Sequence, residues 1–360
     1  MRRILLFPFA LLYGCIIFVR NKLYDWGIFR SQKFDVGTIV VGNLSVGGSG
    51  KSPHIEYLIR LLKKDYSVAT LSRGYKRKTK GFKLAKQHAT AREVGDEPAQ
   101  FKHKFRKQTV AVDEKRTRGI GKIMDIDPYT DVILLDDAFQ HRSVKPGLSI
   151  LITDFHHPYF DDYLMPTGRL REHASGARRA DVVIVSKCPE VVTPFTRRRF
   201  QEGLKLKDHQ SLFFTKYKYG NLHHVFNGSE PPHKLKKYSS IIMLTGIANP
   251  YPMEEKLGPY CNELIKFNYP DHYQYKKSNF ERIKEAYDNI FTTSKIIITT
   301  EKDATRIRTT VGNEIIKDLP LYYIPVEVVF HKGQKQKFDS RILDYVEKNR
   351  RNQSIPKEEN

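Results

Sequence analysis

Residues 38–54 read TIVVGNLSVGGSGKSPH, and the fold class can be inferred outward from this stretch. Positions 38–41 are β-branched and apolar, which predicts a short buried strand ending at Gly42. A glycine-rich loop follows, and residues 54–63 then carry apolar side chains at helical spacing. A strand, a glycine-rich loop and a helix in this order predict a phosphate-binding loop.

The loop has the residue types that phosphate binding requires. Glycines let backbone N–H groups surround phosphate oxygens, the lysine bridges the β- and γ-phosphates of a nucleotide, and the serine after it is a ligand for Mg²⁺. Ser45 stands where the usual pattern has its first glycine, but the GGSGKS core is intact. A glycine-rich turn without a ligand is the alternative, and the surrounding strand and helix argue against it. The predicted nucleotide-binding residues are Gly47, Gly48, Ser49, Gly50, Lys51 and Ser52.

Apolar runs recur along the chain on both sides of a turn-rich stretch. They occur at 67–71, 109–112, 131–136, 148–153 and 181–186, and again at 241–245, 264–267 and 296–300. Strands without alternation are expected where helices cover both faces of a parallel sheet, so two α/β domains are predicted. The expected parts are 1–34, a membrane-associated helix; 35–211, a P-loop NTPase-like domain with a mostly parallel sheet; 212–235, a hinge; 236–348, a smaller α/β domain; and 349–360, a disordered tail.

The composition limits the partners of the chain. It has 62 Lys and Arg against 40 Asp and Glu, a formal charge of +22 over 360 residues. Forty per cent of residues are hydrophobic, which excludes wholesale disorder, and three scattered cysteines argue against a disulfide framework or a cysteine zinc site. The charge fits nucleic acid, an anionic membrane surface or a phosphorylated substrate.

The N-terminus favours a membrane surface among these partners. Positions 4–19 carry no charge but are interrupted by Pro8 and Gly14, and they are short for a membrane span. A signal peptide would need a small-x-small cleavage site, and the basic and aromatic residues at 20–33 do not supply one. We expect an uncleaved, shallowly inserted helix, with a true span and a buried core helix as alternatives.

Charged residues also follow several predicted strands, where α/β sheets bind ligands. Asp136 and Asp137 end an apolar strand and resemble the acidic partner of a P-loop, which holds Mg²⁺ or its waters. Residues 73–86 contain seven Lys and Arg and no acid, which suits an anionic substrate. Asp96 begins a predicted helix and could be a simple cap, and His272 could be structural. Glu301 and Asp303 follow a strand at a position suited to contacting a nucleotide base or ribose.

Taken in order, these segments resemble one known family. VGNLSVGGSGKSP (41–53), SRGYKR (72–77), GDEP (95–98), LLDDAFQHR (134–142), GRLRE (168–172), GIANP (246–250), YPDHYQY (269–275) and TEKDA (300–304) closely resemble the tetraacyldisaccharide 4'-kinases, the lipid A 4'-kinases of Gram-negative bacteria. The likeness runs to about residue 345. Ser49 and Ser52 stand where many members have Thr, and Ala138 stands where Gly is usual; these changes are mild.

The resemblance implies an activity and a set of residue roles. It implies phosphoryl transfer from ATP, with Mg²⁺, to the 4'-hydroxyl of a tetraacylated disaccharide 1-phosphate, an alcohol acceptor, giving lipid IVA. By resemblance, Asp96 takes the hydroxyl proton and His272 pairs with it. Other implied roles are metal or phosphate contacts for Lys51, Ser52, Asp136, Asp137 and Glu172, and substrate contacts for Arg73, Tyr75, Arg77, Gln140, His141 and Arg171.

The expected setting is the cytoplasmic face of the inner membrane of a Gram-negative bacterium, with a monomer as the acting form and no nucleic-acid partner. Three alternatives stay open from the sequence. A membrane-associated P-loop GTPase or ATPase would need a base-specificity motif, and TEKDA is only a partial mimic. A nucleic-acid-dependent ATPase would use the positive charge on phosphodiesters. A scaffold would leave the phosphate loop without a purpose.

Overall fold

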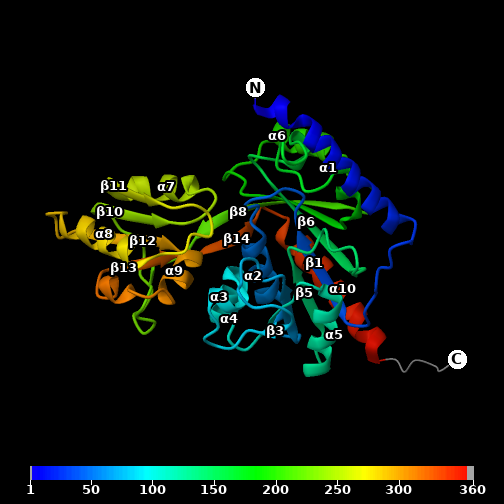
Figure 1. Cartoon of the computed structure of the whole chain (residues 1–360), viewed down its shortest axis with the longest axis horizontal. Helices are drawn as coiled ribbons and strands as arrows, with labels where there is room; N and C mark the ends of the chain where they lie inside the picture. The colour runs from blue at the N-terminus through cyan, green and yellow to red at the C-terminus, as the bar shows by residue number, and fades with distance from the viewer. Residues whose placement is uncertain (1, 355–360) are drawn as a thin grey trace.

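The computed structural model describes the backbone of residues 2–354 and the side chains of residues 6–350, and it forms two α/β lobes with a long N-terminal helix on the surface of the first (Figure 1). The predicted fold class is confirmed: a large, mostly parallel sheet is joined to a smaller α/β unit. Chain position 1 and residues 355–360, which include part of the expected tail, lie outside the described residues.

The first lobe is built on a nine-stranded sheet in the order β14-β8-β7-β6-β1-β5-β2-β4-β3. Neighbouring strands from β8 to β4 are parallel, while β14 and β3 pair antiparallel at the two edges. The strands are β1 (Gly37–Gly42), β2 (Val68–Ser72), β3 (Lys83–Leu84), β4 (Thr109–Val112), β5 (Val132–Asp136), β6 (Leu148–Asp154), β7 (Val182–Ser186), β8 (Ser211–Tyr219) and β14 (Val326–Phe330).

Helices cover both faces of this sheet, which explains why its strands lack polar alternation. One face packs on α2 (Lys51–Leu62), α4 (Asp96–Lys104) and α10 (Lys335–Ser354) through Ile59, Phe101, Ile342 and their neighbours. The other face packs on α5 (Arg116–Ile126) and α6 (Pro194–Leu204). The short helix α3 (Ala91–Val94) precedes α4, and 3-10 turns occupy Tyr159–Asp161 and Ala174–Arg179.

The second lobe repeats the plan on a smaller scale. Its five-stranded sheet has the order β11-β10-β12-β13-β9 and is parallel except at β9. The strands are β9 (His223–His224), β10 (Tyr238–Thr245), β11 (Cys261–Asn268), β12 (Lys295–Thr300) and β13 (Leu321–Ile324). The helices are α7 (Tyr251–Leu257), α8 (Lys277–Asp288) and α9 (Glu301–Arg308), with 3-10 turns at Gly258–Tyr260 and Asn313–Ile316.

Strand pairing differs from the expected division in three places. β8 lies within the segment expected as a hinge, yet it pairs with β7 as part of the large sheet. β14 pairs with β8, and α10 packs on β1, so the chain returns to the first lobe after β13 instead of ending in the second. α10 also runs through residues 349–354, part of the segment expected to be disordered. The return of the chain through β14 and α10 was not predicted because residues 321–330 form two short strands that belong to different sheets.

The N-terminal helix α1 (Arg2–Asp25) lies along the first lobe. Ala10, Tyr13, Gly14 and Ile17 face the protein at helical spacing, and a Cβ at Gly14 would lie 2.8 Å from Leu164 Cδ1. Most other apolar side chains of the helix are exposed. Residues 6–25 are long and apolar enough to cross a membrane, and only 6% of that stretch is buried.

Candidate active site at the sheet edge and between the lobes

The predicted phosphate loop joins β1 to α2 at the centre of the large sheet. Gly47 and Gly50 adopt φ values of 106° and 92°, which favour glycine. A Cβ at Gly50 would lie 2.5 Å from the hydroxyl of Tyr217, so no other residue fits there. The first turn of α2 begins at Lys51, so the free N–H groups of a helix N-terminus face the loop. This arrangement can hold an anionic phosphate group.

Lys51 lies in a network of polar side chains from the neighbouring segments. Its Nζ is 3.0 Å from Asn43 Oδ1 and 3.4 Å from Asp137 Oδ1. Arg171 contacts the same two residues, at 2.6 Å from Asn43 Oδ1 and 3.0 Å from Asp137 Oδ1. Burial alone would raise the pKa of Asp137, but Lys51 and Arg171 outweigh it and hold that pKa well below its usual range. Asp137 is therefore a stable anion between two cations.

Asp136 has a different environment from its neighbour. The register of β1 and β5 pairs it with Val41, directly before the loop. One carboxylate oxygen accepts a bond from Ser72 Oγ at 3.2 Å, and Oδ1 is buried with no partner. Burial, followed by the charge of Asp137, raises the pKa of Asp136 to about 7. A buried carboxylate with an unused oxygen is suited to a cation or its water.

The carboxylate of Glu172 is already occupied. Arg179 Nη2 donates to both of its oxygens at 2.9 and 2.8 Å, Gln140 Nε2 donates at 3.0 Å and Asn21 Nδ2 at 3.1 Å. The residue is 2% exposed. The structure thus gives Glu172 the part of a buried counter-ion, connected to Arg171 through Gln140. It is not a free metal ligand here, contrary to the expectation.

The basic loop after β2 divides into two kinds of arginine. Arg73 is exposed. The pKa of His141 is lowered to about 4 by the burial of its ring and by the charges of Arg116 and Arg73, so Arg73 and His141 lie near one another. Arg77 is anchored inside the loop, donating to Glu114 and to Gly81 O. Nη2 of Arg77 is therefore committed within the fold, and a substrate contact of this residue stays a prediction.

Two predicted motifs meet at the start of α4. Gly95, at φ 94°, packs against Gly74, and a Cβ at Gly95 would lie 3.1 Å from the Gly74 backbone. This close approach places the SRGYKR loop against the beginning of α4. The ring of Tyr75 lies edge-on to that of His272 with centroids 5.2 Å apart, so residues from both lobes meet here.

Asp96 and His272 form the pair that the resemblance implied. His272 Nδ1 is 2.5 Å from Asp96 Oδ2, although the residues come from different lobes. His272 has φ 60°, which is unusual for a non-glycine residue. Its backbone N–H donates to Gly246 O at 3.2 Å. Burial would raise the pKa of Asp96, but hydrogen bonds from His272 and Arg306 hold it well below its usual range. The carboxylate is ionised and aimed at the imidazole.

α4 also lies beside the helix that begins at the phosphate loop. Gln100 Nε2 donates to Glu56 Oε1 at 2.8 Å, and Lys104 Nζ is 2.7 Å from Glu56 Oε2. Glu56 is five residues after Lys51, and these contacts fall four and eight residues after Asp96. The two helices therefore lie side by side on the same face of the large sheet.

The residues expected to contact a nucleotide base are used elsewhere. Asp303 is fully buried and accepts bonds from Gly246 N, Thr300 Oγ1, Tyr275 and Arg306. Glu301 forms an ion pair with Lys104 at 2.8 Å. The structure places both at the contact of the lobes. The prediction for Asp303 is corrected, since a carboxylate saturated by protein donors at the start of α9 has no free oxygen for a ligand.

Arg306 was not among the predicted site residues. It lies three positions after Asp303 on α9, and Nη2 is 2.6 Å from Asp96 Oδ2. The signal available in the sequence was this i, i+3 spacing of opposite charges in a short helix, which is usually a surface pair. Asn43, bound to both Lys51 and Arg171, was missed as well.

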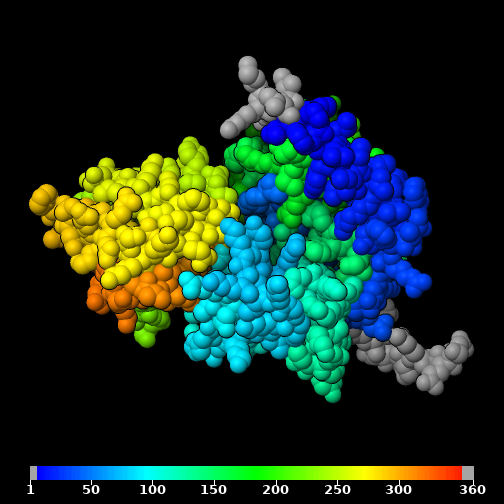
Figure 2. Space-filling model, in the orientation of Figure 1, coloured from blue at the N-terminus to red at the C-terminus, as the bar shows by residue number. Residues whose placement is uncertain are grey.

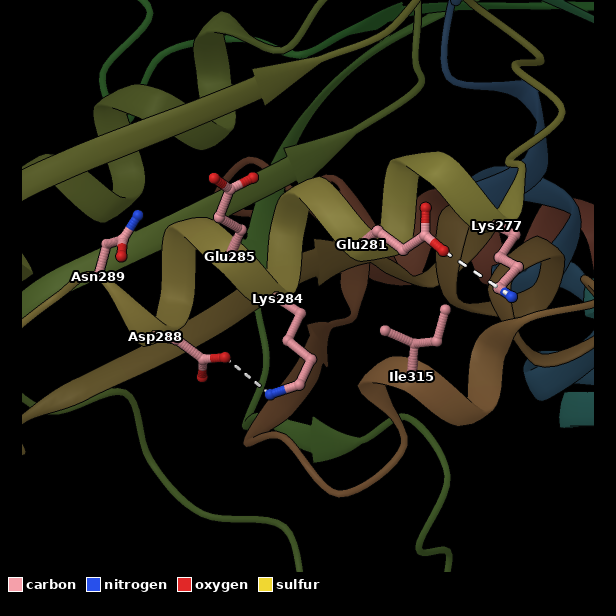
Figure 3. Close-up of a pocket in the computed structure, with 7 residues that line it drawn as sticks. All are labelled: Lys277, Glu281, Lys284, Glu285, Asp288, Asn289 and Ile315. Carbon is pink, nitrogen blue, oxygen red and sulfur yellow. Dashed lines mark hydrogen bonds and ion pairs between the residues drawn. The ribbon is translucent and has the colours of Figure 1, made fainter.

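A surface hollow lies apart from these groups (Figure 3), between α8 and the turn that contains Ile315. Its charged side chains pair along α8 itself, Lys277 with Glu281 at 3.9 Å and Lys284 with Asp288 at 2.7 Å. Nothing in this lining converges on a ligand, so the concave shape alone does not make it a site.

Comparisons with known proteins agree with the geometry. Residues 2–347 match the family described as "Tetraacyldisaccharide-1-P 4'-kinase". The chain is 45% identical to the tetraacyldisaccharide 4'-kinase of Bacteroides thetaiotaomicron, covering 99% of this chain and 96% of that protein. It is 44% identical to that of Phocaeicola vulgatus, with 97% of each covered. The crystal structure of LpxK from Aquifex aeolicus in complex with ATP superposes with a TM-score of 0.72 at 29% identity, over 96% of this chain and all of that one. The chain therefore belongs to the tetraacyldisaccharide 4'-kinase family.

Proposed function

We propose that this protein is an ATP-dependent kinase that phosphorylates the 4'-hydroxyl of tetraacyldisaccharide 1-phosphate, forming lipid IVA in lipid A biosynthesis. The observation that carries the proposal is the Asp96–His272 pair at 2.5 Å, held beside the helix that begins at the phosphate loop. A relative of this family binds ATP, and a phosphate loop with Lys51 is suited to the same nucleotide.

The nucleotide half of the reaction falls to the first lobe. The backbone N–H groups of residues 47–50 surround the phosphate oxygens, and Lys51 neutralises charge on the transferred group. Lys51 contacts Asp137 and Asn43, so nucleotide phosphates would compete with these two residues for its ammonium group. Arg171, held by the same two partners, is the nearest second cation for the phosphates. Glu301 would contact the nucleotide only if its ion pair with Lys104 were broken.

Mg²⁺ fits the residues at this edge of the sheet. Asp136 has a buried carboxylate oxygen without a partner, and Asp137 is anionic. Ser52, in the first turn of α2, adds a hydroxyl. Hard oxygen ligands of this kind suit Mg²⁺, which takes its remaining ligands from phosphate and water. When bound, the ion would neutralise charge on the phosphates, and Glu172 would act one step further out, through Gln140.

The acceptor half requires a base. A sugar hydroxyl is a poor nucleophile at neutral pH, and a positioned carboxylate can accept its proton as the bond to phosphorus forms. Asp96 is ionised, and His272 contacts it from the opposite lobe and can share the proton. The exposed Arg73, the aromatic Tyr75 and the half-buried His141 border this region and are suited to the anionic lipid headgroup.

The proposed assay uses the purified chain with γ-labelled ATP and the disaccharide 1-phosphate in detergent micelles. We expect label in the lipid product, dependent on both lipid and Mg²⁺. ATP hydrolysis without lipid labelling would contradict the proposal and favour an ATPase. Stimulation by nucleic acid with steep salt dependence would favour the nucleic-acid alternative. All described site groups belong to one chain, and we propose a monomer as the acting form.

We propose that α1 rests on the cytoplasmic face of the inner membrane. One side of α1 packs on the first lobe. There the hydroxyl of Tyr13 donates to Arg171 O at 2.7 Å, and Nη2 of Arg20 donates to Gln140 O at 3.0 Å. Its other side exposes Phe9, Leu12 and Ile16, at 63%, 62% and 59%. Exposed apolar residues on a surface helix next to basic groups are typical of shallow insertion into an anionic bilayer.

Substituting the exposed apolar side chains tests this placement. Phe9→Asn, Leu12→Asn and Ile16→Asn together should move the protein from floated anionic vesicles to the soluble fraction, because they remove apolar area without touching Tyr13 or Arg20. The control is Phe291→Asn with Val311→Asn, apolar residues of the second lobe that are more exposed still, and it should leave flotation unchanged. If deletion of residues 1–30 also left binding intact, the anchor would lie elsewhere.

A further inference from the structure

The two lobes meet at two helices, α4 and α9, that are joined by ion pairs. In Figure 2 the second lobe, yellow to orange, abuts the cyan region of the first lobe that contains α4. Ion pairs join α4 to α9: Asp96 to Arg306 at 2.6 Å, Glu97 to Lys302 at 2.9 Å and Lys104 to Glu301 at 2.8 Å. The contact between the lobes thus includes the carboxylate that serves as the base.

Arg306 is fixed by its own lobe before it reaches Asp96. It is 3% exposed, and Nη1 donates to Asp303 Oδ1 and to Gly246 O, both at 2.8 Å. Asp303 is in turn held by Gly246 N at 3.0 Å and by Tyr275 at 3.1 Å. Since the guanidinium is planar and rigid, this anchoring fixes the direction of Nη2. That nitrogen is 2.6 Å from Asp96 Oδ2 and 3.5 Å from His272 Nδ1.

We propose that Arg306 is a positioning residue that keeps Asp96 ionised and aligned with His272, and that it does so only while α4 and α9 are in contact. This inference rests on the proposed function, since it assigns a partner to the base of that reaction. It makes the ionisation of the base depend on closure of the lobes. A chain whose lobes have separated would leave Asp96 without its permanent cation.

The charges around Asp96 explain why Arg306 is needed. Asp96 is 5% exposed, so burial disfavours its charged form. His272 contacts it but loses its charge on deprotonation, whereas an arginine stays protonated. Lys302 lies further away, paired with Glu97, which adds a like charge on the same helix. Arg306 is therefore the one direct partner of Asp96, among the described residues, whose charge does not change during turnover.

The test compares the pH dependence of turnover in matched variants. Arg306→Gln should lower kcat and move the acidic limb of the pH profile upward by about one unit or more, because a buried Asp without its cation binds a proton more readily. Arg306→Lys should shift the limb less, since it keeps the charge but cannot bridge both carboxylates. Lys104→Gln breaks the ion pair with Glu301 between the same helices, and also the one with Glu56 on α2. Both pairs are remote from Asp96, so this variant should leave the limb in place.

A second readout does not depend on activity. The carboxyl carbon resonance of Asp96, assigned by its loss in Asp96→Asn, should titrate at higher pH in Arg306→Gln than in the parent protein. The proposal would be overturned if Arg306→Gln changed neither the acidic limb of the pH profile nor the titration of the Asp96 resonance. It would also be overturned if Lys104→Gln shifted the acidic limb by the same amount. Thermal unfolding shows whether Arg306→Gln is folded. If it is not, the shift of the acidic limb in Arg306→Lys tests the proposal instead. Failure of the parent protein to label lipid would overturn the proposed function, while the resonance would still test Arg306.

Discussion

The nucleotide half and the base half of the site are assembled from different kinds of chain segment. Lys51 begins the helix that follows β1 through the phosphate loop, and Asp136 ends β5, the strand that pairs with β1 in the same sheet. Asp96 and His272 come from opposite lobes and are 176 positions apart in sequence, and their contact depends on packing of α4 against α9. The first half exists in one lobe alone, whereas the second exists only when the lobes are together. Changes in the two halves should therefore have separable effects.

Removal of the loop lysine should produce the largest loss. Lys51→Met is expected to lower kcat about 10³-fold or more, because the transferred phosphoryl group loses its preorganised cation. ATP affinity should also fall, since the same ammonium contacts the ground-state phosphates. Steady-state kinetics and nucleotide titration measure both effects. The control Lys64→Met removes an exposed lysine just beyond the same helix and should change neither.

The base should be nearly as important, but with a different signature. Asp96→Asn keeps the shape of the side chain and removes its basicity, so we expect kcat to fall about 10²–10⁴-fold. ATP affinity should stay within a few-fold, because the phosphate loop lies wholly in the first lobe. Rapid-quench kinetics and nucleotide titration separate the two quantities.

Glu97→Gln is the matched control, since Glu97 lies in the same turn and pairs with Lys302 instead of His272. A parallel loss of ATP binding in Asp96→Asn would show that the two halves are not independent. Turnover close to that of the parent protein would reject Asp96 as the base.

The contrast between the halves also explains what sequence reasoning could reach. The strand and helix of the phosphate loop were predicted because their signals are contiguous: β-branched residues before 42, several glycines in the loop, and Lys-Ser at the helix start. The same holds for Asp136, which ends an unbroken apolar strand. In each case local chemistry and the rule that ligands bind at the carboxyl ends of parallel strands point to one place.

The base half lacked such signals. Asp96 and His272 were paired only through the family resemblance, because nothing local distinguishes a catalytic Asp from a helix cap. Asp303 was predicted to contact the nucleotide. In the sequence, an acidic residue that follows a strand has the same pattern whether it binds a ligand or pairs with an arginine such as Arg306. Which strand pairs with which is also non-local, and for that reason the return of β14 to the first sheet was not foreseen.

The folding of the nucleotide half has its own pH dependence. His54 is buried, with Nδ1 2.7 Å from Gly50 O and Nε2 3.1 Å from Thr215 Oγ1, and burial lowers its pKa to about 4 despite the bond to Gly50. Below the unfolded pKa of about 6.5 the unfolded chain binds a proton that the folded chain excludes. The free energy of unfolding should therefore fall as pH drops from about 6.5 to about 4, by up to about 3 kcal/mol from this residue.

Denaturant titrations at several pH values measure this contribution as a difference between the parent protein and His54→Gln. That difference should vary with pH across this window, whereas His157→Gln, an exposed histidine, should give a constant one. Comparison with the parent is needed because burial also lowers the pKa of His103 and His141 to about 4. A pH-independent difference for His54→Gln would mean that the pKa of its ring is the same in the folded and unfolded chains.

The smallest expected effect distinguishes the two arginines of the loop that lies between the halves. Arg73 is exposed near His141, so Arg73→Gln should raise the KM for the lipid about tenfold, the loss of one charge-assisted contact, with little change in melting temperature. Arg77 is bound to Glu114 and Gly81, and Arg77→Gln should instead lower the melting temperature while leaving the KM for lipid near that of the parent. Micelle kinetics and thermal unfolding of both variants give the four values needed. If Arg77→Gln raised the KM without loss of stability, its guanidinium would have to leave Glu114 when lipid binds, and this loop would rearrange with the base half instead of staying fixed with the nucleotide half.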